Sequence, residues 1–162
     1  MQAVWNTVVG ITAILAIVLT YITIRLQRKA NGDQTFLRLH EILLGDEMRK
    51  GRGLLIEAGK TGKLPALNTA GYREMTHALG GLHTAGIYID HRLMSLQRFM
   101  EVWHHNLRAI RPGAELMAQE RVKELEGWWP WPHLWSLFDA AAKFHDPTMI
   151  CCQHEGRWPH ST

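Results

Sequence analysis

The stretch Leu93-Met-Ser-Leu-Gln-Arg-Phe-Met-Glu-Val-Trp-His-His-Asn-Leu-Arg-Ala-Ile110 contains the clearest structural pattern in the chain. Its apolar side chains recur at alternating intervals of three and four residues, at Leu93, Leu96, Met100, Trp103, Leu107 and Ile110. This spacing places them along one side of an α-helix, as in the seam between packed helices. The stretch therefore predicts a long helix that begins after a cap at Asp90 and buries Trp103 in a helical core.

Helical spacing also flanks this stretch on both sides. Further helices are predicted from Phe36 to about Ala58, from Thr69 to Ala85, from Ala114 to about Glu126, and after Pro132, where Leu134, Leu137, Phe138 and Ala141 share a face. Breaks are predicted at Asn31-Gly32, in the loop from Gly59 to Pro65, at Gly86, at Arg111-Pro-Gly113 and at Gly127. No segment alternates with the period of a strand, so the predicted fold class is all-α.

An apolar segment precedes these helices. Val4 to Ile24 contains 21 residues without a charged side chain, enough to cross a hydrocarbon core of roughly 30 Å as one transmembrane helix. Arg25, Arg28 and Lys29, here called the collar, follow the segment, whereas a cleavable signal peptide carries its positive charge in front. Because basic residues remain on the cytoplasmic side, we expect a single-pass protein of the inner (cytoplasmic) membrane, with its N-terminus outside and its C-terminal domain in the cytoplasm.

The charge balance argues against binding to nucleic acid. The formal net charge of +3 equals the charge of the collar, and the residues after it carry 15 acidic side chains and as many basic ones. A nucleic-acid-binding domain needs a basic face, which this neutral remainder does not predict. Nucleotide binding is not predicted either, because Gly59-Lys60-Thr61 lacks the glycine that a phosphate-binding loop requires five positions earlier, where Leu54 stands.

Two features indicate protein partners. Thr12, Ala16 and Thr20 recur every four residues in the apolar segment, so another membrane helix could approach this small-residue stripe closely, unless the stripe faces lipid. Trp128, Trp129, Trp131 and Trp135 form a tryptophan cluster interleaved with two prolines. Tryptophan is enriched in interface hot spots and at membrane surfaces, so Trp128, Trp129 and Trp131 are predicted to dock on a partner or on the membrane, unless the cluster closes the domain's own core.

No residue pattern predicts catalysis, a cofactor or a metal site. Glu101 and His104 have the spacing of a di-iron motif, which requires a second copy, and an ion-paired helix face with Gln97, Arg108 and Arg111 explains them as well. The tail contains His145, Cys151, Cys152, His154 and His160, whose spacing matches no compact zinc module. The sequence therefore predicts a protein that is not an enzyme.

The order of these parts resembles a family of small single-span bacterial and phage membrane proteins classed as a domain of unknown function. The resemblance covers residues 4–144 and rests on apolar spacing together with Gly86, Asp90, Trp103 and Arg111. It implies a cytoplasmic helical bundle on a membrane anchor and no activity. The predicted organisation is an anchor with its collar at 1–30, a helical bundle at 31–146 and an irregular tail at 147–162.

These features predict an accessory or structural subunit, without catalytic activity, of a larger membrane protein complex, for example a respiratory or photosynthetic one. Its expected partners are the lipid bilayer and other membrane protein subunits. The alternative is a free-standing regulatory or defence protein, such as a prophage exclusion factor.

Overall fold

The computed structural model describes the backbone of residues 2–124, 127 and 129–145, and the side chains of residues 14–123, 127 and 129–145. These residues form five helices and no strand: α1 Gln2–Leu44, α2 Asp46–Thr61, α3 Ala70–Asp90, α4 Leu96–Glu124 and α5 Pro132–Lys143. The predicted all-α fold class is thereby confirmed for this part of the chain. Within the same part, no helix has the combination of length and apolarity that crossing a membrane requires.

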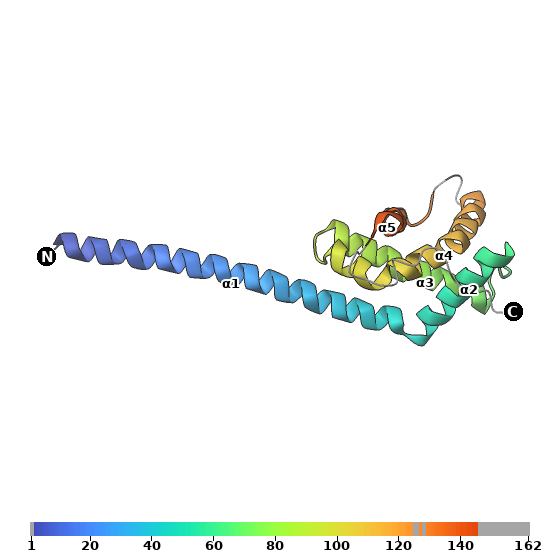
Figure 1. Cartoon of the computed structure of the whole chain (residues 1–162), viewed down its shortest axis with the longest axis horizontal. Helices are drawn as coiled ribbons and strands as arrows, with labels where there is room; N and C mark the ends of the chain where they lie inside the picture. The colour runs from blue at the N-terminus through green and yellow to red at the C-terminus, as the bar shows by residue number, and fades with distance from the viewer. Residues whose placement is uncertain (1, 125–126, 128, 146–162) are drawn as a thin grey trace.

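Helices α2 to α5 form a bundle, and α1 is a long rod that projects from it (Figure 1). α2 packs against α3 and α4, and α5 packs against the same two helices. Only the C-terminal part of α1 contacts α2 and α3, and the N-terminus lies at the far end of the projecting part. The bundle forms most of the core, and the C-terminal part of α1 adds Phe36, Leu39 and Leu43 to it along one side.

The predicted seam of α4 lies in this core, except at its beginning. Trp103 is 2% exposed, and Met100, Leu107 and Ile110 are fully buried with it. Leu93 and Leu96, in contrast, are 52% and 41% exposed, so their assignment to the core was wrong. The reason is the position of the helix start. Asp90, the predicted cap, is instead the last residue of α3. α4 begins at Leu96, and the Oγ of the preceding Ser95 accepts the backbone N–H of Arg98 at 3.4 Å.

The predicted break at Asn31-Gly32 is wrong, because α1 continues through it to Leu44. Glycine in a helix costs about 1 kcal/mol relative to alanine, whereas burial of one large apolar side chain gains about 1.5–3 kcal/mol. Phe36, Leu39 and Leu43 are all buried on the bundle side of α1. Their burial therefore outweighs the local preference for a turn.

The helix predicted from Phe36 to Ala58 is two helices, separated at Gly45. Asp46 and Glu47 occupy the first turn of α2, where carboxylates stabilise the positive end of the helix dipole. Gly62 ends α2 in the left-handed conformation, with its N–H 2.8 Å from the Ala58 carbonyl oxygen. The change of direction lets both α1 and α2 bury apolar side chains in one core.

Gly86 and Pro112 do not end helices, contrary to prediction. Gly86 lies inside α3, and a Cβ there would lie 2.5 Å from the His133 carbonyl oxygen, so the glycine permits close approach of α5. Pro112 lies inside α4, which bends in its C-terminal half (Figure 1). Proline removes one helical hydrogen bond and commonly kinks a helix. The neighbouring Gly113 packs directly against the backbone of Leu55.

Other sequence predictions are confirmed. The helix predicted from Thr69 is α3, and the Thr69 hydroxyl caps it by accepting the Tyr72 backbone N–H at 3.3 Å. Gly127 has a φ of 92° and donates its N–H to the Val122 carbonyl oxygen, as expected after a helix end. α5 begins at Pro132 and buries the predicted face, which consists of Leu134, Leu137, Phe138 and Ala141.

Candidate functional site

The projecting segment of α1, defined here as residues 14–31, has no contact partner for its apolar surface among the described residues. Every side chain in it is exposed. The exposed large apolar side chains are Ile14, Leu15, Ile17, Val18, Leu19, Tyr21, Ile22, Ile24 and Leu26. They point in all directions around the helix, and a helix that is apolar all round is normally covered by protein or lipid. The side chains of residues 4–13, the first part of the predicted span, lie outside the described ones.

Two members of the small-residue stripe lie in this segment. The Thr20 hydroxyl donates a hydrogen bond to the Ala16 carbonyl oxygen at 2.7 Å, within the same helix. Its polar group is therefore satisfied, and Ala16 and Thr20 present small apolar surfaces that are exposed in the monomer. The side chain of Thr12 lies outside the described residues.

The collar follows directly. Arg25 lies with its guanidinium carbon 5.6 Å from the centroid of the Tyr21 ring, and Arg28 and Lys29 are exposed. An aromatic ring next to basic side chains is typical of the interfacial ends of membrane helices. α1 continues without interruption beyond the collar into the part that contacts the bundle.

A buried polar cluster fastens that part of α1 to the bundle. Arg52 of α2 donates a hydrogen bond to the carbonyl oxygen of Leu43, near the end of α1. The guanidinium carbon of Arg52 lies 5.0 Å from the ring centroid of Trp103, whose Nε1–H donates to His40 Nδ1 at 3.2 Å. Desolvation by burial, and then the charge of Arg49, lower the pKa of Arg52. Three helices thus meet at one ring, and α1 is held by hydrogen bonds as well as by apolar contact.

The tryptophan cluster follows the C-terminal end of α4, where the chain turns back to α5, which begins against the C-terminal part of α3 (Figure 1). Trp129 is 45% exposed, and its ring centroid lies 5.3 Å from that of Trp135. Trp131 and Trp135 are partly buried against the core, and Arg121 lies 5.2 Å above the Trp131 ring. The cluster therefore combines both readings, since two rings close the core and Trp129 faces outward. Trp128 lies outside the described residues.

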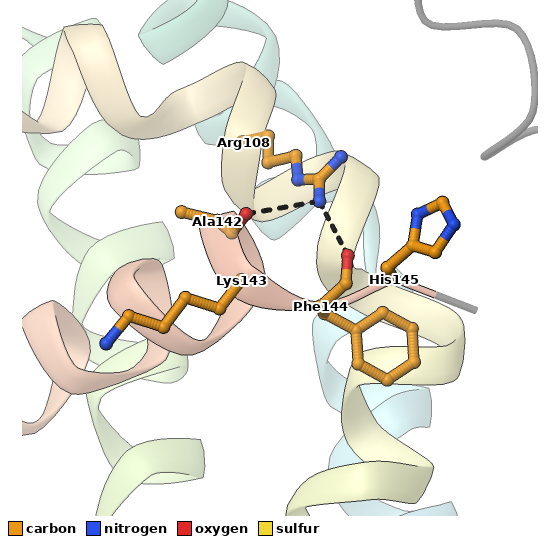
Figure 2. Close-up of a pocket in the computed structure, with 5 residues that line it drawn as sticks. All are labelled: Arg108, Ala142, Lys143, Phe144 and His145. Atoms are coloured by element: carbon orange, nitrogen blue, oxygen red, sulfur yellow. Dashed lines mark hydrogen bonds between the residues drawn. The ribbon is translucent and has the colours of Figure 1, made fainter. Parts of the chain in front are cut away.

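The polar face of α4 is more than a solvated stripe. Figure 2 shows Arg108 beside a surface cavity of about 400 Å³ that it lines with Ala142, Lys143, Phe144 and His145. The guanidinium donates to the Ala141 carbonyl oxygen at 2.8 Å and to that of Phe144 at 2.7 Å. Arg108 thereby caps the C-terminal end of α5, where unpaired carbonyl groups need donors.

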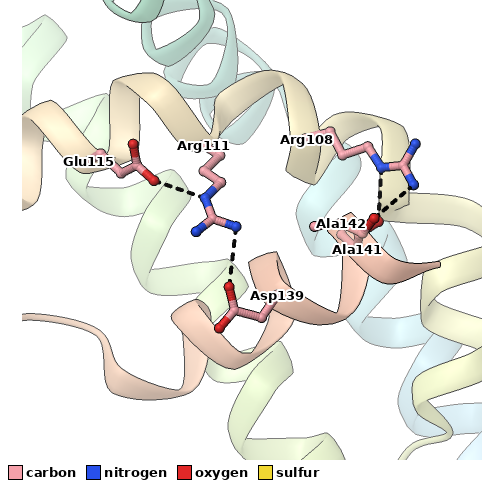
Figure 3. A network of polar contacts seen from close by, with 6 residues as sticks. All are labelled: Arg108, Arg111, Glu115, Asp139, Ala141 and Ala142. Carbon is pink, nitrogen blue, oxygen red and sulfur yellow. Dashed lines mark hydrogen bonds and ion pairs between the residues drawn. The ribbon is translucent and has the colours of Figure 1, made fainter. Parts of the chain in front are cut away.

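Arg111 makes the second link between the same helices. It donates to Glu115 at 2.8 Å and to Asp139 of α5 at 3.2 Å (Figure 3). The hydrogen bond that Arg111 donates to Glu115 is the largest influence on Arg111 and raises its pKa, with Asp139 adding to it. Because both arginines are engaged by α5, this face has a structural role.

The di-iron spacing of Glu101 and His104 brings no metal-binding group together. His104 is buried, with Nδ1 2.7 Å from the Met100 carbonyl oxygen, and Glu101 accepts a hydrogen bond from the Gln97 amide. In the described part of the chain, no group of three or more His, Cys, Asp or Glu side chains is arranged to hold a metal ion. Cys151, Cys152, His154 and His160 lie outside it.

Sequence reasoning missed a histidine pair between α3 and α5. The rings of His83 and His133 have centroids 5.2 Å apart, and His133 Nδ1 contacts a carboxylate oxygen of Asp90. The Nδ1 atom of His83 is buried without a hydrogen-bond partner, and burial, followed by the charge of His133, lowers its pKa. The steps of three and four from His83 to Gly86 and Asp90, which place all three on one face of α3, were the available signal.

Comparisons with protein-family models, with curated proteins and with solved structures yield no match to this chain. The site is therefore interpreted from its own geometry.

Proposed function

We propose that this protein is an accessory or structural subunit, without catalytic activity, of a larger membrane protein complex. In this proposal, α1 is its single transmembrane anchor, and the bundle is its cytoplasmic contact domain. The observation that carries the proposal is the projecting segment, whose exposed apolar side chains surround a helix that leaves the bundle.

The energetics of this segment favour an apolar surrounding. Isolated helices gain little stability in water, and most helices in proteins are stabilised by packing of an apolar face. Ile17 is 69% exposed, and Leu19 and Leu26 are each 63% exposed. Removing apolar surface from water gains about 25 cal/mol per Å². Lipid around this segment supplies that gain, and the collar then lies at the cytoplasmic surface.

The small-residue stripe supports a lateral contact within the membrane. Packing in lipid has no hydrophobic drive and depends on close approach, which small side chains permit. Because the Thr20 hydroxyl already donates a hydrogen bond within α1, it does not need a polar partner on the approaching helix. We therefore propose that a helix of the partner complex packs on Ala16, Thr20 and the preceding Thr12.

The tryptophan cluster supports a second contact, made by the bundle. Trp129 is 45% exposed and its ring lies against that of Trp135, so the ring is held at the surface of the bundle. An exposed tryptophan of this kind is typical of the residues that dock on a protein partner, and we therefore propose that Trp129 contacts the partner complex. The prolines on either side of Trp131 limit the entropy lost on docking.

The test is native-size analysis after solubilisation of the source membranes in mild detergent. The proposal expects the protein to migrate with a large complex. A monomer or small homo-oligomer would contradict it and favour the free-standing regulatory or defence protein.

A matched pair of variants tests the docking role of Trp129. Trp129→Ser is expected to weaken co-migration at least tenfold, because a tryptophan that is buried in an interface contributes about 2 kcal/mol or more to binding. Val102→Ser is the control, since Val102 is also 45% exposed but lies on α4, outside the tryptophan cluster. Equal co-migration of both variants would show that Trp129 does not contact the partner.

Membrane attachment and orientation need a separate measurement. We expect the protein to stay with membranes in alkaline carbonate, and protease added to inside-out vesicles to digest the bundle. Release by carbonate would contradict the anchor, and protection of the bundle would contradict the orientation.

A further inference from the structure

The turn between α3 and α4, together with the first residue of α4, is called the corner and comprises residues 91–96; it is the end of the bundle that lies beside the projecting helix. The ideal Cβ position of Gly32 in α1 lies 3.4 Å from the Leu93 carbonyl oxygen. Arg98, just after the corner, forms an ion pair with Asp33 of α1. Figure 1 shows this turn, in yellow-green, as the part of the bundle nearest the N-terminal half of α1. The contacts of Leu93 and Arg98 with α1 therefore fix the position of the corner relative to this helix.

The corner exposes two leucine side chains. Its backbone is hydrogen-bonded, with the N–H of Arg92 2.9 Å from the Ile89 carbonyl oxygen and the N–H of Leu93 2.8 Å from that of Tyr88. Arg92 has a φ of 57°, in the left-handed region that side chains other than glycine rarely adopt. Met94 turns into the core, whereas Leu93 and Leu96 are 52% and 41% exposed. A defined turn thus presents two leucines to the surroundings.

The charges around the corner suit an anionic surface. His91 and Arg92 are exposed in the turn, and the collar lies within two helical turns of Gly32 on α1. The two acidic side chains that flank the corner each have a basic partner, since Asp33 pairs with Arg98 and Asp90 contacts His133. The net charge offered by this end of the molecule is therefore positive.

The distance along α1 sets the height of the corner above the proposed membrane. Gly32 lies eight positions after Ile24, the last residue of the apolar segment, which is about 12 Å along the helix. The headgroup region extends roughly 5–8 Å beyond the hydrocarbon core on each side, and membrane helices tilt by about 20° on average. The corner beside Gly32 therefore lies about 11 Å from the hydrocarbon core, a few ångströms outside the headgroup layer, which is a distance that a side chain can span.

We propose that the corner binds the surface of the membrane, with Leu93 and Leu96 inserted among the headgroups and with Arg92 and the collar bound to anionic phosphates. This inference rests on the proposed anchor and adds a second lipid contact to it. The contact orients the bundle against the bilayer, because the corner and α1 touch the membrane at two separate points.

The experiment uses the full chain with Cys151→Ser and Cys152→Ser, reconstituted in vesicles of phosphatidylcholine with about one third phosphatidylglycerol, a fraction chosen to give a negative surface. A single cysteine introduced by Leu93→Cys carries an environment-sensitive fluorophore, which is quenched by lipids brominated near the headgroup. Leu67→Cys is the matched control, because Leu67 is 44% exposed and lies between α2 and α3, at the opposite end of the bundle (Figure 1). We expect quenching to be several-fold stronger at position 93 than at position 67.

The charge contribution is measured in the same system. Vesicles of phosphatidylcholine alone, or the additional substitution Arg92→Gln, are expected to reduce quenching at position 93 by half or more. If quenching at position 93 is unaffected by either change, no anionic headgroup is bound there, and that part of the proposal is overturned.

Carbonate extraction of the same vesicles separates the two proposals. Release of the labelled chain would overturn the anchor. A chain that is retained but shows equal quenching at positions 93 and 67 would overturn the corner contact while leaving the anchor intact. A fluorophore at position 93 that is shielded in native membranes but unquenched in vesicles would also overturn it, since the corner then contacts a protein.

Discussion

The guanidinium carbon of Arg52 lies 5.0 Å from the centroid of the Trp103 ring, while the same guanidinium donates to the Leu43 carbonyl oxygen. One buried cation thus links the end of α1 to the centre of α4. Cation–π contacts of this kind contribute about 0.5–2 kcal/mol, more when the cation is desolvated. The arrangement makes α1 part of the folded domain.

Truncation of Trp103 tests the core. We expect Trp103→Ala to lower the free energy of unfolding by about 3–5 kcal/mol, because a large buried side chain is lost and a cavity remains. Urea unfolding in mild detergent, followed by circular dichroism, measures it. The control Trp129→Ala should change the value by no more than about 0.5 kcal/mol, as surface substitutions do. Similar values for both variants would contradict the assignment of Trp103 to the core.

Replacement of Arg52 tests how α1 is fastened. Arg52→Met leaves the Leu43 carbonyl oxygen without this donor, so we expect a loss of about 1–3 kcal/mol in unfolding free energy. Arg49→Met serves as the control, because Arg49 is exposed and pairs with its neighbour Asp46 across one helical turn. A loss no greater than that of the control would show that the buried hydrogen bond adds no stability.

Two helical glycines differ sharply in their surroundings. A Cβ at Gly113 would collide with the backbone of Leu55, whereas a Cβ at Gly53 meets nothing within 4 Å. We expect Gly113→Ala to destabilise the protein by about 1–3 kcal/mol through overpacking. Gly53→Ala should stabilise it by about 0.5–1 kcal/mol through helix propensity. Thermal melts of both variants give the two signs, and a stabilising Gly113→Ala would show that α2 and α4 are less closely packed.

The lowered pKa of His83 predicts a loss of stability in acid. In the unfolded chain the imidazole has its ordinary pKa of about 6.5, so below that pH the unfolded state takes up a proton that the folded state resists. The contribution of His83 is therefore complete above about pH 6.5 and decreases as the pH falls below it. Unfolding free energies measured across this range should show a smaller pH dependence in His83→Gln. His91→Gln, at an exposed position, should keep the original dependence.

The small-residue stripe predicts sensitivity to size. Ala16→Leu places a larger side chain where a partner helix is proposed to approach, so we expect co-migration with the complex to weaken by about tenfold, equivalent to about 1.4 kcal/mol. Leu19→Ile conserves volume on α1 and should leave co-migration unchanged. If Ala16→Leu co-migrates as well as the control, the stripe faces lipid.

Periodicity predicted the helices that are decided by their own apolar faces. α5 follows from Pro132 and a face of four apolar positions, and the buried seam of α4 follows from Met100 onward. Leu93 and Leu96 fit the same period but precede or begin the helix, and period alone does not reveal where a helix starts. Their exposure is a property of the corner, which depends on contacts with α1 distant in sequence.

The remaining errors concern glycine and proline. Asn31-Gly32, Gly86 and Pro112 are local signals for a break, yet all three lie inside helices. Position 86 has to be glycine because a Cβ there would collide with the backbone of His133. This is a contact between α3 and α5, which no local sequence pattern reveals. The cluster around Trp103 was unpredictable for the same reason, because Arg52 and His40 come from two other helices.

The unbroken course of α1 has a mechanical consequence. A flexible joint at Asn31-Gly32 would let the bundle swing independently of the anchor, whereas a continuous helix makes the two a single lever. A change of about 20° in the tilt of α1 therefore turns the whole bundle by the same angle. Any movement of the proposed anchor within its complex is thereby passed on to the bundle, and a pull on Trp129 is transmitted in reverse to the membrane that α1 is proposed to cross.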